Sequence, residues 1–201
     1  MPQDISGYDV GALLYCPANA HHTVAQAVAA ERLPRPFSLA LCLEDTVRAD
    51  ALAAAEQAVE QTLHDLTDAA RQETFYRPLT FVRVRSPEQL ARLGRAYGKY
   101  RPLLTGFILP KFFIETCGAY CAVIRDLQAD GLDYFYMPVF EAPSMLPLHT
   151  RHAALAEVKA QLDALRKCIL NIRVGGNDLC HVFGLRRDPG HTIYDLRPVA
   201  D

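Results

Sequence analysis

Several strongly apolar runs of this sequence end in charged side chains. The charged residues at or just after these ends are Glu44, Asp45, Lys111, Glu141 and Asp178, and Arg83 lies within another such run. In parallel α/β folds, functional side chains collect at the carboxyl ends of strands. A charge beside an apolar core is costly unless it is paired or binds a metal ion. Several carboxylates with arginine and lysine at one edge therefore indicate a hard divalent cation that holds an anionic substrate.

Each of these residues also has a purely structural explanation. Asp45 and Asp178 could cap the turns or helices that follow them, because aspartate is a preferred cap. Arg83 and Lys111 could be solvated or could form structural ion pairs. The position of Glu141 favours a functional role, because this residue ends the most aromatic run of the chain, where an unpaired charge is energetically costly.

The elements that must position this chemistry are short apolar runs that alternate with helical patterns. The predicted strands cover residues 10–16, 37–43, 79–85, 105–110, 134–140 and 168–174. The predicted helices cover residues 50–71, 112–129 and 149–167, and a further helix begins at the capping box Ser86-Pro87-Glu88-Gln89. Six strand–helix units about 30 residues apart predict a parallel sheet with helical crossovers. An open doubly wound sheet and a (β/α)8 barrel share this pattern, although the absence of G-x-G-x-x-G after the first run weakens the dinucleotide-binding version.

The composition excludes several classes of protein. The chain has 201 residues, half of them hydrophobic, and a formal net charge of −2. Disorder needs lower hydrophobicity and higher charge, and nucleic-acid binding needs a basic patch that this sequence lacks. No stretch is long and apolar enough for a membrane span, and the N-terminus lacks the pattern of a signal peptide. We therefore expect one globular domain over residues 1–201, located in the cytoplasm.

The cysteines and histidines give weaker signals. The six cysteines are scattered, mostly within apolar runs, which indicates reduced thiols in a core rather than disulfides. Cys117 and Cys121 could share one helical face, but they lack partners for a zinc site. His149 and His152, three residues apart, fit an exposed first turn better than a metal site.

Five motifs of the sequence resemble those of one known family. Leu43-Glu44-Asp45-Thr46-Val47 looks like L-E-D-[SA]-V, Val82-Arg83-Val84-Arg85 like V-R-[IV]-N, and Leu109-Pro110-Lys111 like L-P-K. Phe140-Glu141-Ala142-Pro143 corresponds to I-E-[TS]-[AP], and Gly175-Gly176-Asn177-Asp178-Leu179 with Gly184 corresponds to G-x-x-D-L…G. All five occur in the family order, so the chain resembles the citrate lyase β-subunit and HpcH/HpaI aldolase family over most of residues 10–187.

The resemblance implies an α/β fold of the (β/α)8 TIM-barrel type, with about six of the eight strand–helix units visible in this chain. It also implies a Mg²⁺-dependent carbon–carbon lyase or aldolase. The implied substrate is a small carboxylate, namely a 2-oxo acid, or an acyl-CoA thioester of the hydroxyacyl type. Cleavage would pass through a metal-stabilised enolate.

The same resemblance assigns roles to individual residues. Glu141 and Asp178 would bind the metal, and Arg83 would contact the substrate carboxylate or carbonyl. Glu44 and Asp45 would be catalytic residues that support the metal-bound waters. Either of them, or a metal-bound hydroxide, could act as the general base. Two further positions are expected to contact substrate, Lys111 and Gly176.

Three features depart from the family pattern. Arg85 stands where the family has asparagine, and Glu141 and Asp178 are 37 residues apart, which suggests an extended fifth unit. Eight units need about 250 residues, so we expect a truncated chain, an open barrel, or a wall supplied by a partner. Because an open parallel sheet exposes edge strands, the sequence also favours a homo-oligomer.

These departures leave an alternative function open. The chain could be a divergent, non-catalytic family member that binds a metal ion and a ligand bearing phosphate or carboxylate. In that case the segment Gly175-Gly176-Asn177-Asp178 would offer backbone N–H groups to the anion at the start of a helix.

Overall fold

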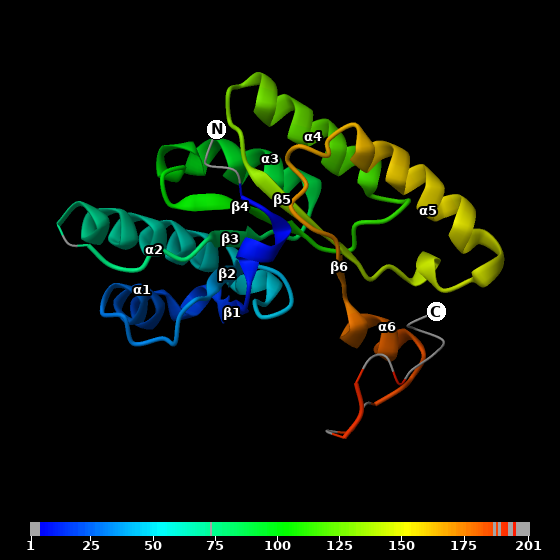
Figure 1. Ribbon diagram of the computed structural model, residues 1–201, viewed down its shortest axis with the longest axis horizontal. Helices are drawn as coiled ribbons and strands as arrows, with labels where there is room; N and C mark the ends of the chain where they lie inside the picture. The colour runs from blue at the N-terminus through cyan, green and yellow to red at the C-terminus, as the bar shows by residue number, and fades with distance from the viewer. Residues whose placement is uncertain (1–4, 73, 187, 189, 193–194, 196–201) are drawn as a thin grey trace.

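Six parallel strands form one curled sheet with most of the helices on its outer side (Figure 1). The computed structural model describes residues 5–72, 74–186, 188, 190–192 and 195. The strands are β1 (Leu13–Pro17), β2 (Ser38–Cys42), β3 (Thr80–Arg83), β4 (Leu104–Leu109), β5 (Phe135–Phe140) and β6 (Arg173–Val174). The helices are α1 (His21–Ala29), α2 (Leu52–Gln72), α3 (Pro87–Ala96), α4 (Cys117–Ala129), α5 (Leu148–Asp163) and α6 (Gly176–Val182).

The order of the strands separates the two architectures that the sequence left open. Each strand pairs with the next one along the chain, in the order β1-β2-β3-β4-β5-β6, and every pair is parallel. A doubly wound sheet reverses its strand order at a switch point, whereas a barrel wall does not. The described part of the chain is therefore a partial (β/α)-barrel wall, as the family resemblance implied.

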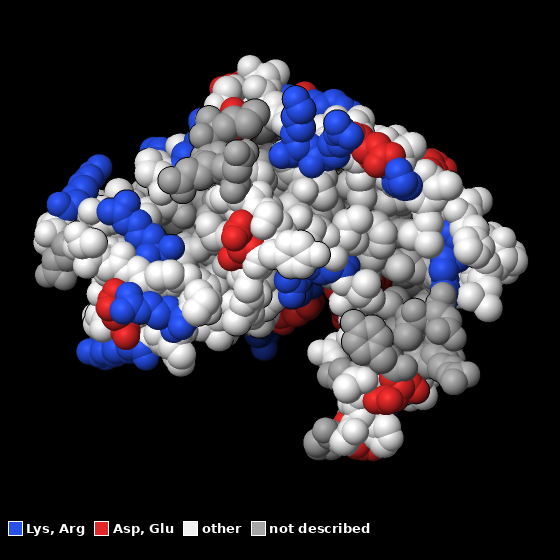
Figure 2. Space-filling model, viewed as in Figure 1, with Lys and Arg blue, Asp and Glu red and all other residues white. Residues whose placement is uncertain are grey.

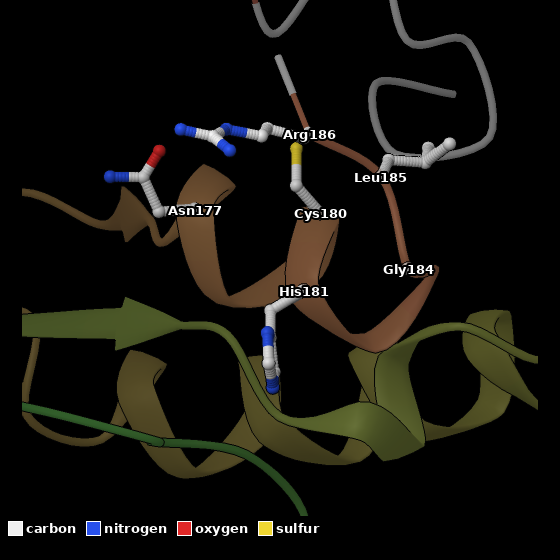
Figure 3. Close-up of a pocket in the computed structure, with 6 residues that line it drawn as sticks. All are labelled: Asn177, Cys180, His181, Gly184, Leu185 and Arg186. Carbon is white, nitrogen blue, oxygen red and sulfur yellow. The ribbon is translucent and has the colours of Figure 1, made fainter.

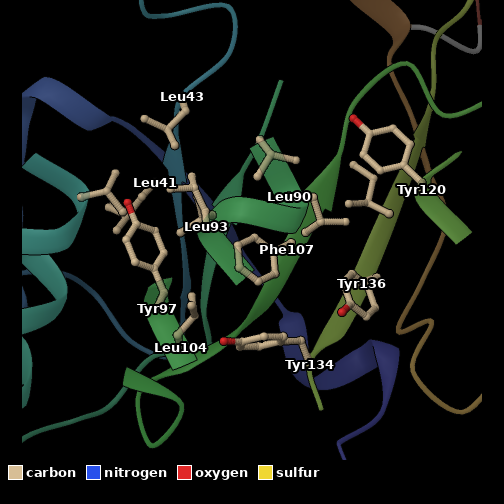
Figure 4. Packing of buried hydrophobic residues seen from close by; sticks show 14 of the residues in the cluster. Leu41, Leu43, Leu90, Leu93, Tyr97, Leu104, Phe107, Tyr120, Tyr134 and Tyr136 are labelled. Carbon is tan, nitrogen blue, oxygen red and sulfur yellow. The ribbon is translucent and has the colours of Figure 1, made fainter. Parts of the chain in front are cut away.

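Two layers of apolar side chains flank the sheet, because successive residues of a strand point to opposite faces. The outer layer packs the sheet against the helices and holds most of the large buried side chains, including Leu41, Phe107, Tyr120 and Tyr136 (Figure 4). The inner layer lines the concave face with a smaller set, namely Val10, Ala40, Phe81, Ile108, Met137 and Val139. Strands buried on both faces explain why the runs in the sequence are continuously apolar.

The predicted capping box at Ser86 forms in part. Ser86 has extended backbone and its hydroxyl accepts a hydrogen bond from the backbone N–H of Gln89, with Pro87 at the first helical position of α3. The Gln89 side chain accepts its return bond from the backbone N–H of Arg85 rather than from Ser86. The cap therefore ties the start of α3 to the end of β3.

The sixth predicted strand is less regular than the sequence indicated. Ile169 forms a bridge to Tyr136, and regular pairing resumes only where Arg173 lies opposite Val139. The segment between these two pairs has one more residue than β5, which is the signature of a β-bulge. The prediction of a continuous strand over 168–174 was wrong on this point, because apolar character alone does not reveal an inserted residue.

The other five predicted strands and the predicted helices are confirmed within a few residues at their ends. The long fifth unit contains α5, preceded by a short 3-10 turn over Pro143–Met145. Among the described residues, no helix combines the length and apolarity needed to cross a bilayer.

The contact between β4 and β5 gives a stability test. A Cβ atom at Gly106 would lie 1.8 Å from the backbone oxygen of Phe135, so Gly106→Ala must push the two strands apart. We expect this substitution to lower the free energy of unfolding by about 2–3 kcal/mol, as measured by urea denaturation. The matched control is Gly118→Ala in the first turn of α4, where no atom lies within 4 Å of the new Cβ. The control should leave stability unchanged or raise it by up to about 1 kcal/mol.

Candidate active site

The guanidinium of Arg83 is the centre of the charged cluster. Arg83 ends β3 on the concave face, and its Nη2 lies 2.5 Å from Glu44 Oε2 and 3.0 Å from Glu141 Oε1. Asp45 Oδ2 lies 3.3 Å from the same nitrogen. These carboxylates come from the loop after β2 and from the end of β5, so the parallel sheet gathers them at its carboxyl edge, as predicted.

The cluster is largely buried. The side chains of Arg83, Glu44 and Glu141 are 12%, 7% and 2% exposed, whereas that of Asp45 is 52% exposed. The Nε atom of Arg83 is buried and has no hydrogen-bond partner among the described residues. A buried donor without a partner is costly, so this side of the guanidinium is suited to an oxygen atom of a ligand.

Lys111 joins the cluster through both its side chain and its backbone. Its Nζ donates a hydrogen bond of 2.9 Å to Glu44 Oε1, and its backbone N–H donates one of 3.1 Å to Glu141 Oε1. Lys111 has φ of +50°, a left-handed conformation that is uncommon for a residue with a Cβ atom. Backbone held in this region marks places where surrounding contacts determine the geometry, and such places are frequent at functional sites.

Electrostatics in the cluster favour protons on the buried carboxylates. Burial, followed by the neighbouring side chain of Asp178, raises the pKa of Glu141 to about 7, against the lowering effect of Arg83. Burial also raises the pKa of Glu44, although Lys111 and Arg83 oppose the shift. The hydrogen bond to Glu44 raises the pKa of Lys111. Four carboxylates thus face two cationic groups at the sheet edge, and additional positive charge would relieve their repulsion.

Gly175 allows Glu141 and Asp178 to come together. Asp178 lies in the first turn of α6, which starts immediately after β6. A Cβ atom at Gly175 would lie 2.0 Å from Glu141 Oε2 and 2.5 Å from Glu141 Cβ, so a larger residue cannot occupy this position without moving the carboxylate. Gly176 begins α6 beside this pair. Its role as a substrate contact stays a prediction.

The structure rejects the capping roles considered for Asp45 and Asp178 and keeps the ion pairs considered for Arg83 and Lys111. Asp45 does not cap a helix, because α2 starts only at Leu52 and the turn before it begins after Arg48. Asp178 is not a cap either, since Gly175 occupies the N-cap position of α6. Arg83 and Lys111 do form ion pairs, and these pairs are the cluster itself.

The sequence did not reveal the role of Arg85, which stands where the family has asparagine. Its Nε donates a hydrogen bond of 2.6 Å to the backbone oxygen of Leu43, and its Nη2 donates to those of Glu44 and Val47. The guanidinium therefore holds the loop that carries Glu44 and Asp45. The position of Arg85, two residues after Arg83, was the signal in the sequence that it lies near the site. Only the folded loop shows which carbonyl groups Arg85 reaches.

Two further residues on the concave face were not selected from the sequence. The Arg83 guanidinium carbon lies 5.9 Å from the ring centroid of Tyr15 on β1, and the Arg173 guanidinium carbon on β6 lies at the same distance from that ring. The ring of Tyr15 is thus within cation–π reach of two arginines, one on β3 and one on β6.

A separate hollow is lined by none of the residues of the charged cluster. A cavity of about 530 Å³ beside α6 is lined by Asn177, Cys180, His181, Gly184, Leu185 and Arg186 (Figure 3). None of these lining residues is a carboxylate, and His181 points away from Arg186 on the opposite side of the helix. This cavity therefore lacks the carboxylates by which Mg²⁺ is usually held.

The histidines and cysteines behave as the sequence predicted. His149 and His152 are exposed at the start of α5. All six cysteines are free, and five of them are buried. Within the described ranges, no group of three or more histidine, cysteine, aspartate and glutamate side chains is arranged to hold a metal ion.

The parallel barrel wall and the carboxylates at its carboxyl edge are typical of a TIM-barrel type protein whose site can accept a cation. A family model described as C-C_Bond_Lyase of the TIM-Barrel fold matches residues 4–201. The chain therefore belongs to this family of carbon–carbon bond lyases.

Solved structures share the fold. The citrate lyase β subunit from Mycobacterium tuberculosis, complexed with oxaloacetate and magnesium, aligns with a TM-score of 0.57 and 22% identity over 96% of this chain and 71% of that one. The protein CitE from Mycobacterium tuberculosis, in complex with magnesium and acetate, aligns with a TM-score of 0.56 and 19% identity over 96% of this chain and 68% of that one. No curated protein sequence matches the chain significantly.

The loop clamp made by Arg85 can be tested by stability. Arg85→Ala would leave the backbone oxygens of Leu43, Glu44 and Val47 without their cationic donor, and we expect the free energy of unfolding to fall by about 2 kcal/mol or more in urea denaturation. Arg71→Ala is the control, because Arg71 pairs with Asp68 where both side chains are exposed, and it should cost under about 1 kcal/mol. Equal losses for the two variants would show that Arg85 does not hold the loop.

The raised pKa of Glu141 predicts a pH dependence of stability. Its folded pKa of about 7 lies above the ordinary value of 4.5, so the folded protein binds more protons than the unfolded chain between these values. Stability from this group is therefore gained as the pH falls through 7 and lost as it rises again. In urea denaturation between about pH 8 and pH 5, wild type should gain stability relative to Glu141→Gln. The exposed Glu157→Gln variant should follow wild type, and a pH-independent difference for Glu141→Gln would contradict the shift.

Proposed function

We propose that this chain is a Mg²⁺-dependent carbon–carbon bond lyase, or catalyses the reverse condensation, on a 2-oxo acid or a hydroxyacyl-CoA type substrate. The observation that carries the proposal is the position of Arg83, whose Nη2 contacts both Glu44 and Glu141 at the carboxyl edge of the sheet. Membership in the lyase family and the magnesium and carboxylate ligands of the two Mycobacterium tuberculosis structures support the same chemistry.

The residues present fit a magnesium ion. Mg²⁺ is usually held by one or two carboxylates and keeps its other positions for water and substrate oxygens. Glu141 and Asp178 would supply these two carboxylates, and the Cβ-free Gly175 beside Glu141 leaves the space that they need. When bound, the ion would act as a Lewis acid on the substrate carbonyl.

Arg83 would bind and orient the substrate. Its buried Nε has no hydrogen-bond partner among the described residues and is available to a carboxylate or carbonyl oxygen. As the carbon–carbon bond breaks, its electron pair passes to the fragment that becomes an enolate. A fixed guanidinium stabilises the negative charge that develops on the enolate oxygen, and this preorganised interaction is stronger in a buried site than in water.

The proton of the substrate hydroxyl must leave as the bond breaks. Glu44 and Asp45 are the candidate acceptors, because both lie within 3.3 Å of Arg83 Nη2. Lys111 holds Glu44 through a hydrogen bond of 2.9 Å, whereas Asp45 is half exposed and can exchange the proton with solvent. The same proton, returned to the enolate carbon, would complete the second product.

The domain organisation, the location and the assembly of this protein are also part of the proposal. We propose that residues 1–201 act as one domain, a view supported by the unbroken order of the six strands. Six free thiols suit a reducing compartment, which supports a cytoplasmic location. The edges of the sheet at β1 and β6 support homo-oligomer formation, since parallel sheets rarely leave edge strands uncovered.

Calorimetry of Mg²⁺ binding, with and without pyruvate or oxaloacetate, tests the proposal. We expect wild type to bind Mg²⁺ more tightly when a 2-oxo acid is present, because the acid supplies additional oxygen ligands. Glu141→Gln and Asp178→Asn should each weaken Mg²⁺ binding at least about tenfold.

Glu157→Gln is the matched control, because it removes one exposed carboxylate elsewhere and should bind Mg²⁺ as wild type does. Mg²⁺ binding without any coupling to the oxo acid would instead favour a non-catalytic binding protein. Binding that survives both Glu141→Gln and Asp178→Asn would reject the metal site.

A further inference from the structure

The β-bulge before β6 turns an arginine toward the concave face. Ile169 pairs with Tyr136 of the outer layer, but after the inserted residue Arg173 pairs with Val139 of the inner layer. Paired residues of neighbouring strands point to the same face, and a shift of one residue exchanges the two faces. Without the bulge, the apolar neighbours of Arg173 would occupy the inner face instead.

A cation is unusual on this face. The concave side of a (β/α) barrel is normally filled by bulky apolar residues, and the inner layer of this sheet follows that rule from Phe81 to Val139. Arg173 is half-buried there, and its guanidinium carbon lies 5.9 Å from the ring centroid of Tyr15. Among the described residues, no carboxylate lies within ion-pair distance of Arg173, in contrast to Arg83. A half-buried guanidinium without an acidic partner is suited to an external anion.

The two arginines face one space. Tyr15 pairs with Ala40 of the inner layer, and Arg83 with Ile108 of the same layer, so both side chains share the concave face with Arg173. Because each guanidinium carbon lies 5.9 Å from the Tyr15 ring centroid, the two are at most twice that distance apart. Figure 2 shows basic and acidic atoms next to each other at the notch between the sheet and the part of the chain that carries α6.

The N-terminal segment helps to bring the strands of this space together. A Cβ atom at Gly7 would lie 2.7 Å from the backbone oxygen of Leu170, so the segment before β1 lies directly against the segment before β6. The Ser38 hydroxyl donates a hydrogen bond of 2.7 Å to the backbone oxygen of Val10. Val10 belongs to the inner layer, so this segment packs against the concave face that Tyr15 and Arg173 share.

We propose that Arg173, supported by the ring of Tyr15, is a second anion subsite. It binds one carboxylate of a ligand whose other carboxylate is bound by Arg83. The proposal rests on the proposed function, since that function places a carboxylate ligand on Arg83. Arg173 thereby selects ligands that carry two carboxylates over ligands that carry one. Arginine suits this role because its planar fork binds both oxygens of a carboxylate.

The test is calorimetry on the full chain in the presence of Mg²⁺, with oxaloacetate as the dicarboxylate probe and pyruvate as the monocarboxylate probe. We expect Arg173→Gln to weaken oxaloacetate binding about tenfold or more and to change pyruvate binding less than about twofold. Arg173→Lys keeps the charge but loses the fork, so an intermediate loss is expected. Tyr15→Leu should weaken oxaloacetate binding by about two- to fivefold.

Arg166→Gln, an exposed substitution on the same segment, is the matched control and should bind both probes as wild type does. Mg²⁺ binding by Arg173→Gln in the absence of either probe reports whether the variant retains the fold. If Arg173→Gln does not fold, Arg173→Lys and Tyr15→Leu carry the test.

The outcomes separate the two proposals. Equal effects of Arg173→Gln on both probes, or no effect on oxaloacetate, would overturn the subsite while leaving the lyase proposal intact. Loss of oxaloacetate preference in Arg173→Gln, together with Mg²⁺ binding that survives both Glu141→Gln and Asp178→Asn, would support the subsite and reject the metal site. Failure of wild type to bind oxaloacetate more tightly than pyruvate would overturn the subsite.

Discussion

The charged site depends on one guanidinium that lies among several carboxylates. Without Arg83, Glu44 and Glu141 would be like charges forced together at a buried edge of the sheet, and both would have to take up protons. Removing one partner of a buried ion pair is strongly destabilising, because it leaves the other charge uncompensated. The remaining contacts of the cluster follow from this pairing, since Lys111 binds the same two carboxylates from the next strand.

The barrel-type topology makes this convergence possible. Each parallel strand delivers its carboxyl end to the same edge, so residues 44, 83, 111 and 141 meet although up to 97 positions separate them in the sequence. Rigid loops are then needed to hold the side chains in place. Arg85 fixes the loop after β2 through its hydrogen bonds to the backbone. After β4, Lys111 has a left-handed backbone conformation that is held by its surroundings. Arg83 at the end of β3 therefore belongs to the charged cluster, and Arg85, two residues later, holds the loop that carries part of the cluster.

A large part of this architecture could be predicted from the sequence. Continuous apolar runs indicated strands buried on both faces, and the charges at their ends indicated the functional edge, because both signals depend only on local residue type and spacing. The capping box at Ser86 indicated the start of α3 for the same reason. The hydrogen-bond partners of Arg85 could not be predicted, since the carbonyl groups that it binds belong to a loop 38 to 42 positions earlier in the chain.

The sequence by itself determined the strand–helix alternation, the family and the group of charged residues at the strand ends. Only the tertiary structure decided which side chains share the concave face, as the arginine of β6 shows. A single inserted residue between Ile169 and Arg173 reverses the two faces of the strand, and the apolar pattern of this segment is compatible with either register. The pairing with β5 selects one of them, because the inner and outer layers of the sheet must each remain continuous.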